Sequence, residues 1–463
     1  MKSHKMTVDV DLLKQYDRPG PRYTSYPTAP YFHEGITQKA YLDNIRKENE
    51  AQGTRPISLY FHLPFCDTLC YFCGCNMMVT QNRQKIAQYI DYLEKEIRLL
   101  RPHIARDRKV AQMHWGGGTP THLSPDQIRR LGNIIREHFD FTEDAEIGVE
   151  IDPRELTREH MVALAEMGFN RCSMGIQDFD PQVQKAVNRL QSERITRDGL
   201  AWARELGFAS TNLDLMYGLP YQNTATFEHT LDVVLSLDPD RLAVFNYAHL
   251  PSRIKHQRLI PAEQLPNAEE KLQLLKMSIE KLTEAGYEYI GMDHFAKPDD
   301  ELTVAMQKGT LYRNFQGYST HAGLDLFALG ISSIGMFPEL YVQNMKKLDG
   351  YYSELDNGNL PVMRGVALSE DDRLRREVIT ELMCNLVLKK ADIEGKYSIQ
   401  FDEYFAPALE QLKSFQRDDL VILEEKRIRV TVSGRLLIRN IAMNFDAYLQ
   451  DNAADKPQFS RTV

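Results

Sequence analysis

Short apolar runs of strand length alternate, over the first two thirds of the chain, with longer segments whose apolar residues recur every three to four positions. Most runs end at Gly, Pro or Asp, residues that favour a turn. The runs predict strands at 57–62, 111–115, 146–151, 171–176, 211–216, 241–247 and 288–292. In the helical segment after the first run, one face carries Ile86, Tyr89, Ile90, Leu93 and Ile97.

A weak internal repeat, Glu-x-Gly-aromatic, marks the ends of three predicted helices. It occurs at 166–169, 205–208 and 284–287, each time just before a predicted strand. Gly in this place is typical of the left-handed residue that follows a helix. Alternating strands and helices with short connections predict right-handed βαβ units around a parallel sheet. Six or seven units exceed a mononucleotide-binding fold, so we expect an α/β fold of the incomplete (β/α) barrel type.

The pattern changes towards both ends of the chain. Residues 1–50 contain a stretch rich in turn and aromatic residues at 20–27, which predicts an arm closing over the active site. Residues 51–365 form the predicted barrel, and 366–463 a smaller, mainly helical C-terminal domain. This last region predicts helices at 369–388 and 434–449 and a hairpin from 420–425 and 428–432. It resembles a winged helix, whose wing could touch nucleic acid, although a docking or lid role fits an acidic chain better.

Composition narrows the class of protein. The chain has 463 residues, 43% hydrophobic and 26% charged, which is the balance of a soluble globular protein. Its net charge of −9 argues against nucleic acid or an anionic membrane as partner. No apolar run approaches the roughly 18 residues of a membrane span, and the first residues lack the apolar region of a secretory signal. We therefore expect a cytoplasmic protein, and nothing in the pattern demands more than a monomer.

Four of the six cysteines lie within ten positions, at Cys66, Cys70, Cys73 and Cys75. Clustered cysteines in a reducing compartment usually bind metal or act in catalysis. The first three form C-x3-C-x2-C directly after the first predicted strand, whereas structural zinc sites and ferredoxin clusters need four ligands. Three thiolates on a four-iron cluster leave one iron open to a small chelating molecule. A zinc knuckle and plain buried thiols are the alternatives.

Further polar and glycine residues stand where predicted strands end. The second strand runs into Gly116-Gly117-Gly118-Thr119, which lacks the Gly-Lys-Ser/Thr of a phosphate loop and the third Gly of a dinucleotide fingerprint. A bare turn is the alternative, but glycines at this end of a barrel strand let a ligand approach the backbone. Other strands lead to Glu150, Gln177, Arg189 and Asp214. Each alone could be a cap or ion-pair partner, whereas together they predict a ligand site.

The three-cysteine spacing resembles that of the radical S-adenosylmethionine (SAM) superfamily, with Tyr71 and Phe72 as aromatic neighbours. Over essentially its whole length the chain further resembles the oxygen-independent coproporphyrinogen III oxidase (dehydrogenase) family of haem biosynthesis. The matching motifs are residues 20–29, 70–76, 114–121, 246–251, 291–296 and 313–318. Haem-chaperone-like relatives share the cysteine loop, but they generally lack the arm and carry Asp-Phe where this chain has Gly74-Cys75.

The resemblance implies the cofactors. A [4Fe–4S] cluster would be held by Cys66, Cys70 and Cys73, with SAM at the open iron and a second SAM beside it. The first SAM would contact Tyr60, Gly117, Glu150 and Ile334. The second would contact Phe72, Gly118, Thr119, Gln177, Arg189, Asp214 and Ala248. Carboxylates such as Glu150 or Asp214 suit ribose hydroxyls, and Arg189 suits a carboxylate.

The resemblance also implies the reaction. Two propionate side chains of coproporphyrinogen III would be oxidatively decarboxylated to vinyl groups, giving protoporphyrinogen IX, with electrons from a one-electron donor protein of unknown identity. Candidate catalytic residues are Tyr60, His62, Cys75 and Arg22, the last as a propionate clamp. His62 could equally be a satisfied core histidine, and Cys75 a structural thiol.

Two other functions stay open at this point. One is a radical SAM or haem-handling relative that acts on another tetrapyrrole. The other is a non-enzymatic metal or electron-transfer protein.

Overall fold

The computed structural model describes residues 6–450 and 459–462, and its centre is one 12-stranded sheet. The sheet order is β16-β15-β14-β13-β1-β4-β5-β6-β7-β8-β10-β9. From β13 to β8 all neighbours pair in parallel, whereas the strands at both edges pair antiparallel. Within the described residues the two edge strands, β16 and β9, do not pair with each other. This confirms the predicted incomplete barrel.

The strands and helices have the following bounds. The sheet strands are β1 Ile57–Leu63, β4 Val110–Gly117, β5 Phe141–Ile151, β6 Arg171–Gln177, β7 Ser210–Tyr217, β8 Arg241–Asn246, β9 Glu288–Gly291, β10 His294–Ala296, β13 Asp325–Leu329, β14 Ile334–Met336, β15 Leu340–Asn344 and β16 Val362–Ala367. The smaller sheets contain β2 Phe65–Cys66, β3 Met78–Val79, β11 Tyr312–Asn314, β12 Gly317–Ser319, β17 Val387–Lys389, β18 Val421–Leu423 and β19 Arg427–Val430. The helices are α1 Val10–Tyr16, α2 Gln38–Gln52, α3 Arg83–Leu100, α4 Pro125–His138, α5 Arg158–Glu166, α6 Pro181–Ala186, α7 Glu193–Glu205, α8 Thr224–Leu237, α9 Ala268–Glu284, α10 Glu301–Lys308, α11 Leu348–Asp356, α12 Glu370–Asn385, α13 Lys390–Tyr397, α14 Phe401–Tyr404, α15 Ala406–Arg417, α16 Ile438–Ala442 and α17 Ala447–Gln450.

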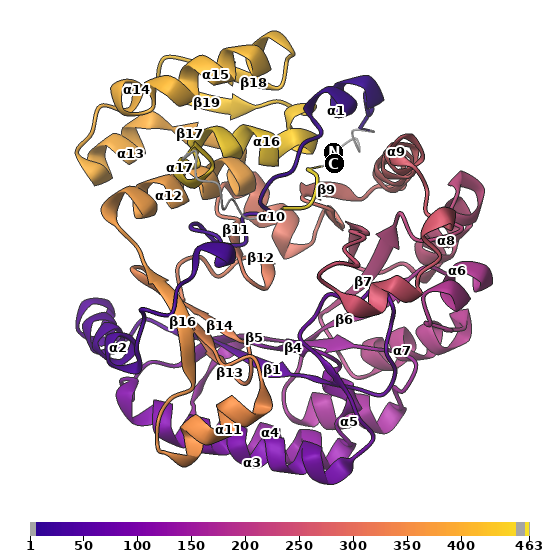
Figure 1. Ribbon diagram of the computed structural model, residues 1–463, viewed down its shortest axis with the longest axis vertical. Coiled ribbons are helices and arrows are strands. Elements are labelled where there is room, and N and C mark those ends of the chain that lie inside the picture. The colour runs from indigo at the N-terminus through magenta and orange to yellow at the C-terminus, as the bar shows by residue number, and fades with distance from the viewer. Residues whose placement is uncertain (1–5, 451–458, 463) are drawn as a thin grey trace.

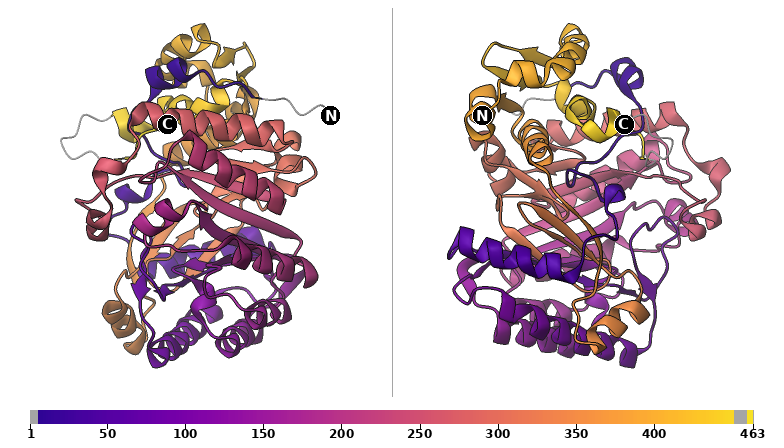
Figure 2. Two further views of the ribbon diagram at one scale, coloured as in Figure 1. Left: turned by 90° about the vertical axis from the view of Figure 1, so that its right-hand side faces the viewer. Right: turned by 60° about the vertical axis from the view of Figure 1, so that its left-hand side comes forward.

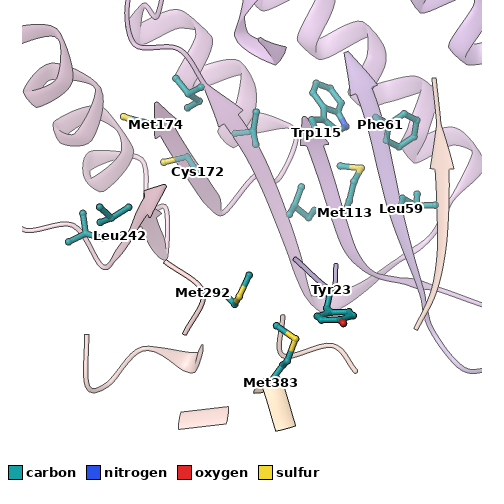
Figure 3. Packing of buried hydrophobic residues seen from close by; sticks show 14 of the residues in the cluster. Tyr23, Leu59, Phe61, Met113, Trp115, Cys172, Met174, Leu242, Met292 and Met383 are labelled. Carbon is teal, nitrogen blue, oxygen red and sulfur yellow. The ribbon is translucent and has the colours of Figure 1, made fainter. Parts of the chain in front are cut away.

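Alternation along the parallel strands separates a packed side from a polar side. Leu59 and Phe61 of β1 and Met113 and Trp115 of β4 are buried in the large hydrophobic core, where Figure 3 shows them on neighbouring strands. Helices such as α3, α4 and α5 cover the outer side of the sheet in Figure 1. The intervening residues are polar, for example Ser58, Tyr60 and His62 of β1. Because side chains alternate along a strand, these polar residues line the inner side of the curved sheet.

Most predicted elements are confirmed. Gly168, Gly207 and Gly286 adopt φ values of 84°, 78° and 98°, as expected after a helix. The run at 288–292 forms a strand, β9, but its expected parallel pairing with the preceding strand is wrong: β9 pairs antiparallel with β10, which lies between it and β8 and pairs antiparallel with β8. The seventh parallel strand is β13, which returns beside β1. Which strands become neighbours depends on the path of the chain, which local periodicity does not report.

The predicted helix at 434–449 is also wrong as one continuous helix. Asp446 has an extended backbone, and its side chain accepts hydrogen bonds from the N–H groups of Tyr448 and Leu449. It therefore ends one turn of helix and caps the next, α17. The predicted hairpin forms as β18 and β19, which pair antiparallel, with β17 as third strand.

Both terminal regions lie against the open side of the sheet. The C-terminal helices α12 to α15 gather there in Figure 1, and α1 lies next to them in both views of Figure 2. The N-terminal segment is bonded to this region, since Tyr23 donates to Asp446 at 2.8 Å and Arg439 donates to the carbonyl of Pro21 at 2.9 Å. The division at residues 50 and 365 stays a prediction. Among the described helices, none combines the length and apolar character that crossing a bilayer requires.

Candidate active site

The cysteine loop, residues 64–79, follows β1 at the carboxyl ends of the parallel strands. It is fastened at both ends: β2 pairs in parallel with β3, and the N–H of Met78 bonds to the carbonyl of Pro64 at 2.6 Å. A tight turn brings the N–H of Cys73 to the carbonyl of Cys70 at 3.1 Å. The four cysteines Cys66, Cys70, Cys73 and Cys75 line one cavity, which we call the cysteine cavity.

The glycine loop at the end of β4 lies directly against the cysteine loop. Gly118 N–H donates to the carbonyl of Leu63 at 2.9 Å, and Thr119 N–H to that of Phe65 at 2.8 Å. A Cβ at Gly118 would stand 2.7 Å from the carbonyl carbon of Pro64, so no larger residue fits there. The two loops therefore form one unit whose close backbone contact requires glycine.

The three predicted ligands have different surroundings. Cys66 Sγ lies 3.3 Å from the hydroxyl of Thr119, and burial raises the pKa of its thiol to about 12. Cys70 Sγ accepts from Arg154 Nη2 at 3.2 Å and from Arg189 Nη1 at 3.4 Å. A hydrogen bond from Cys75 lowers the pKa of Cys73. Cys70 is thus the sulfur that faces the most positive charge.

These thiols fit an iron–sulfur cluster. Within the described residues, no three His, Cys, Asp or Glu side chains converge as they would around a single metal ion. The ligands of a four-iron cluster bind separate irons and so stand apart around a shared space. Cys66, Cys70 and Cys73 do so around the cysteine cavity, and two guanidinium groups compensate the charge of the thiolates.

Glu150, at the end of β5, connects the glycine loop to β4. Its Oε2 accepts from the N–H of Gly117 at 3.0 Å, and its Oε1 lies 3.6 Å from His114 Nε2. Burial raises the pKa of Glu150, but the nearby His114 and the hydrogen bond from Gly117 outweigh it and hold the pKa below its usual value. Glu150 is therefore an ionised acceptor at the centre of the site.

The predicted residues of the second SAM site surround the cysteine cavity. Phe72, Gly118, Thr119, Gln177, Arg189 and Asp214 all line it, whereas Ala248 does not. The side-chain oxygen Oε1 of Gln177 is buried without a hydrogen-bond partner, and Gln177 has a left-handed φ of 70°. Burial raises the pKa of Asp214 to about 6, although Ser173 donates to its Oδ2 at 2.8 Å. The unpartnered amide oxygen of Gln177 and the carboxyl group of Asp214, with its raised pKa, lie in one cavity and suit a polar ligand.

The predicted residues of the first SAM site line a neighbouring cavity, which we call the tyrosine cavity. Tyr60, Gly117, Glu150 and Ile334 lie there together with His62 and Cys75. Cys75, Gly117 and Glu150 line both cavities, so the two spaces adjoin. The two predicted groups of residues therefore lie around two adjoining cavities, with Gly117 and Glu150 shared between them and Ala248 outside both.

Tyr60 and His62 form a fixed pair. The hydroxyl of Tyr60 lies 3.2 Å from His62 Nδ1, and His62 Nε2 lies 2.8 Å from the carbonyl of Asn76. A carbonyl only accepts, so Nε2 donates and Nδ1 accepts from Tyr60. Burial lowers the pKa of His62, which agrees with this neutral tautomer. His62 thereby ties β1 to the loop residue that follows Cys75.

Ala248 and Arg22 lie outside these two cavities. The carbonyl of Ala248 accepts from Gln257 Nε2, which also donates to the carbonyl of Phe72, each at 3.2 Å. Arg22 forms an ion pair with Asp293 and lies 5.9 Å from the ring centre of Phe245. Its charge already has a carboxylate partner, so the predicted role as a propionate clamp requires this pair to open.

Comparison with known proteins finds similarity along the whole chain. The model of the radical SAM superfamily matches residues 60–234, and that of the HemN C-terminal domain matches residues 368–437. Oxygen-independent coproporphyrinogen III oxidase of Salmonella typhimurium is 50% identical over 463 residues, which cover 100% of both chains. The same enzyme of Pseudomonas aeruginosa is 49% identical over 98% of both chains.

This chain belongs to the oxygen-independent coproporphyrinogen III oxidase family. The solved structure of coproporphyrinogen III oxidase from Escherichia coli, described as a radical SAM enzyme, matches with a TM-score of 0.91 and 49% identity. It covers 96% of this chain and 100% of its own. The family resemblance and the fold expected from the sequence are both confirmed.

Sequence reasoning missed several residues that line the two cavities. Asp152 and Arg154 stand at the end of β5, and Asp152 Oδ2 accepts from both Arg154 and Arg189. His114 stacks on Tyr60 with ring centres 6.1 Å apart, and Lys346 lines the tyrosine cavity. Asp152 and Arg154 follow the end of a strand, the same signal that pointed to Glu150. Lys346 gave no such signal, because it follows β15, which pairs antiparallel with both of its neighbours.

Proposed function

We propose that this chain catalyses the oxygen-independent oxidative decarboxylation of two propionate side chains of coproporphyrinogen III, giving protoporphyrinogen IX in haem biosynthesis. The observation that carries this is the three-thiol loop bonded to the glycine loop, in a chain that matches the curated oxidases end to end. The enzyme is thus a SAM-dependent oxidoreductase.

Cys66, Cys70 and Cys73 would hold a [4Fe–4S] cluster, and Cys75 would not be a ligand. When bound, the cluster and SAM supply a radical that removes hydrogen from the β-carbon of a propionate. We assign two SAM molecules to the adjoining tyrosine and cysteine cavities, which share Glu150 and Gly117. Support for two molecules rests on this division of the cavity lining.

The chain's own residues bind and orient the ligands. Ionised Glu150 accepts from polar groups near both cavities, and Asp214 accepts on the far side of the cysteine cavity. Gln177 offers its unpartnered carbonyl oxygen, and Arg189 sits beside Asp152 with its Nε buried and unpartnered. Preorganised polar groups of this kind fix a ligand without reorganisation.

Tyr60 and His62 serve as positioning residues for the tyrosine cavity. Neutral His62 keeps the hydroxyl of Tyr60 directed along β1 and holds the carbonyl of Asn76, so the end of the cysteine loop stays in place. Cys75 lines both cavities next to Cys73 and is placed to donate a proton.

The substrate carries several carboxylates, whereas the chain has a net charge of −9. Local cations must therefore attract it. Lys346 lines the tyrosine cavity, and Arg364 lies behind it, donating from Nε to Gln343 at 2.7 Å. Neither forms an ion pair with a described carboxylate. We assign a propionate-binding role to Lys346, supported by Arg364.

The N-terminal arm and the C-terminal domain are proposed to close the site against side reactions of the radical. Support comes from the bonds that join them, such as Tyr23 to Asp446. We also propose a monomer in the cytoplasm, where a reducing environment keeps the thiols free, with a one-electron donor protein as partner and with neither nucleic acid nor membrane.

The decisive experiment is an anaerobic product assay. The reconstituted protein is incubated with coproporphyrinogen III, SAM and dithionite, and products are separated by chromatography. Protoporphyrinogen IX with two vinyl groups is expected. SAM cleavage without a vinyl product would point to another tetrapyrrole substrate, and zinc without sulfide in the purified protein would remove the radical mechanism.

A further inference from the structure

Two segments that are distant in sequence pack against the cysteine loop. In the first, 187–190, the carbonyl of Val187 accepts from the N–H of Tyr71 at 3.0 Å, and Asn188 donates to the carbonyl of Leu69 at 2.8 Å. In the second, 248–260, His256 Nε2 lies 2.7 Å from the carbonyl of Cys73. No residue of 248–260 lines the tyrosine or the cysteine cavity in the described structure. This segment therefore covers the loop without belonging to the ligand-binding cavities.

The two segments and the loop pack as one unit. A hydrophobic cluster separate from the main core joins Val187 and Ile260 with Tyr71 and Phe72 of the cysteine loop. Segment 248–260 is itself compact, since the N–H of Ile254 bonds to the carbonyl of Leu250 at 2.9 Å. A short chain of hydrogen bonds and packed side chains would therefore connect the cysteines to a protein bound on the outside of this unit.

Exposed apolar side chains concentrate around this unit. Six large apolar side chains are exposed among the described residues, and four of them lie on the cysteine loop or on the two segments bonded to it. The four are Val79, Leu190, Leu250 and Leu259. Leu190 and Leu259 are the most open of these, at 67% and 58% exposure. Scattered exposed apolar residues are ordinary, but Leu190, Leu250 and Leu259 all lie on the two segments that pack on this one loop, which suits a contact surface.

The same surface is positively charged, although the molecule as a whole is negatively charged. Residues 248–262 include Arg253, Lys255 and Arg258 but no Asp or Glu, in a chain of net charge −9. All three cations are exposed. Within the described structure neither Lys255 nor Arg258 forms an ion pair. An apolar patch with a cationic rim suits a transient acidic protein partner, because charge steers the encounter and apolar contact holds it.

We propose that this surface, formed by Leu190 and the exposed residues of 250–259, is the docking site of a small acidic electron-carrier protein. The inference rests on the proposed function, since only a cluster-bearing enzyme needs such a partner. One electron leaves the reduced carrier and enters the cluster held by the cysteine loop, so the carrier is oxidised and the cluster reduced by one electron. No atom or proton is transferred. The path crosses segment 248–260, whose His256 and Gln257 bond directly to the loop backbone.

The test uses the reconstituted full-length protein and a purified flavodoxin as the acidic carrier. The charge-reversed double variant Lys255→Glu/Arg258→Glu is compared with a matched control, Lys308→Glu/Lys426→Glu, in which two exposed cations outside this surface are reversed. Binding is measured by calorimetry at low and high salt. Reduction of the cluster by the flavodoxin hydroquinone is followed by stopped-flow absorbance.

We expect the Lys255/Arg258 variant to bind flavodoxin at least tenfold more weakly and to be reduced correspondingly more slowly, and the control to behave as wild type. Leu259→Ser should weaken binding while leaving its salt dependence unchanged. Iron content and dithionite-driven turnover should stay the same in all variants. The inference is overturned if wild type does not bind flavodoxin, or if both double variants bind equally well. Failure of dithionite-driven turnover in wild type would instead refute the proposed function.

Discussion

Arg154 donates a hydrogen bond from Nη2 to Sγ of Cys70 at 3.2 Å. The same guanidinium holds Asp152, which in turn accepts from Arg189 Nη1 at 3.0 Å. Burial raises the pKa of Asp152, but the two guanidiniums outweigh it and lower the pKa to about 2. Asp152 therefore holds two guanidinium groups against the sulfur of Cys70, a proposed cluster ligand, and hydrogen bonds to cluster-ligating sulfurs tune the reduction potential of a cluster.

Replacing Arg154 should lower the potential of the cluster. In Arg154→Ala a positive charge and one hydrogen bond to Cys70 are lost, which disfavours the reduced, more negative cluster. We expect the midpoint potential to fall by tens of millivolts in a titration followed by electron paramagnetic resonance. Arg158→Ala, on the exposed start of α5, should leave the potential unchanged. An equal potential in both variants would contradict this role for Arg154.

The four clustered cysteines should divide into three ligands and one neighbour. Cys66→Ser, Cys70→Ser and Cys73→Ser are each expected to lose iron, sulfide and turnover. Cys75→Ser should retain the cluster, although its turnover falls, because Cys75 lines both cavities next to the reacting groups. Iron and sulfide analysis with absorbance spectra separates these outcomes. Loss of iron in Cys75→Ser would show that the ligand assignment is wrong.

We expect ionised Asp214 to lower the stability of the folded protein, although it contributes to ligand binding. Burial raises its pKa from 3.8 to about 6, so the folded protein holds this proton more tightly than the unfolded chain. The resulting stabilisation is present at low pH and is lost as the pH rises through about 6, amounting to up to about 3 kcal/mol.

Asp214→Asn removes this titration. The variant should therefore gain stability over wild type between about pH 4 and about pH 7 in urea unfolding, while binding SAM more weakly. Asp299→Asn, an exposed carboxylate, serves as control and should show no such trend. A constant difference between Asp214→Asn and wild type across this range would refute the prediction.

Gly118 should not tolerate a side chain. The Cβ of Gly118→Ala would stand 2.7 Å from the carbonyl carbon of Pro64 and 2.9 Å from the carbonyl oxygen of Phe65, so the two loops must separate. We expect a loss of bound iron and at least a tenfold loss of SAM affinity in equilibrium binding. The matched substitution Gly395→Ala meets no atom within 4 Å and lies in α13, where it should raise stability by about 0.5–1 kcal/mol.

Lys346 should affect the binding of the substrate and not the binding of SAM. Removing a cation that contacts a carboxylate, as in Lys346→Ala, is expected to raise KM for coproporphyrinogen III about tenfold, or about 1.4 kcal/mol. The KM for SAM should stay unchanged. Lys347→Ala removes the adjacent cation, which does not line the cavity. A rise in KM for SAM alone would assign Lys346 to the cofactor.

The parts of this protein that could be predicted are local ones. A helix face such as Ile86 to Ile97 repeats within a few residues, and Gly168 needs only its own left-handed backbone. The C-x3-C-x2-C loop lies within eight positions, so its thiols are close in any fold. The antiparallel pairing of β9 and the break at Asp446 escaped prediction, because both depend on segments that meet only after folding.

The sequence by itself determined the strands, the helices and the three thiols that share one loop. Only the tertiary structure decided that Arg189, 119 residues from Cys70, reaches its sulfur, that Glu150 stands between two cavities, and that Leu190 and segment 248–260 cover the cysteine loop. The physical reason is that local periodicity reports which side of an element is buried, whereas packing over the whole chain selects what that side meets.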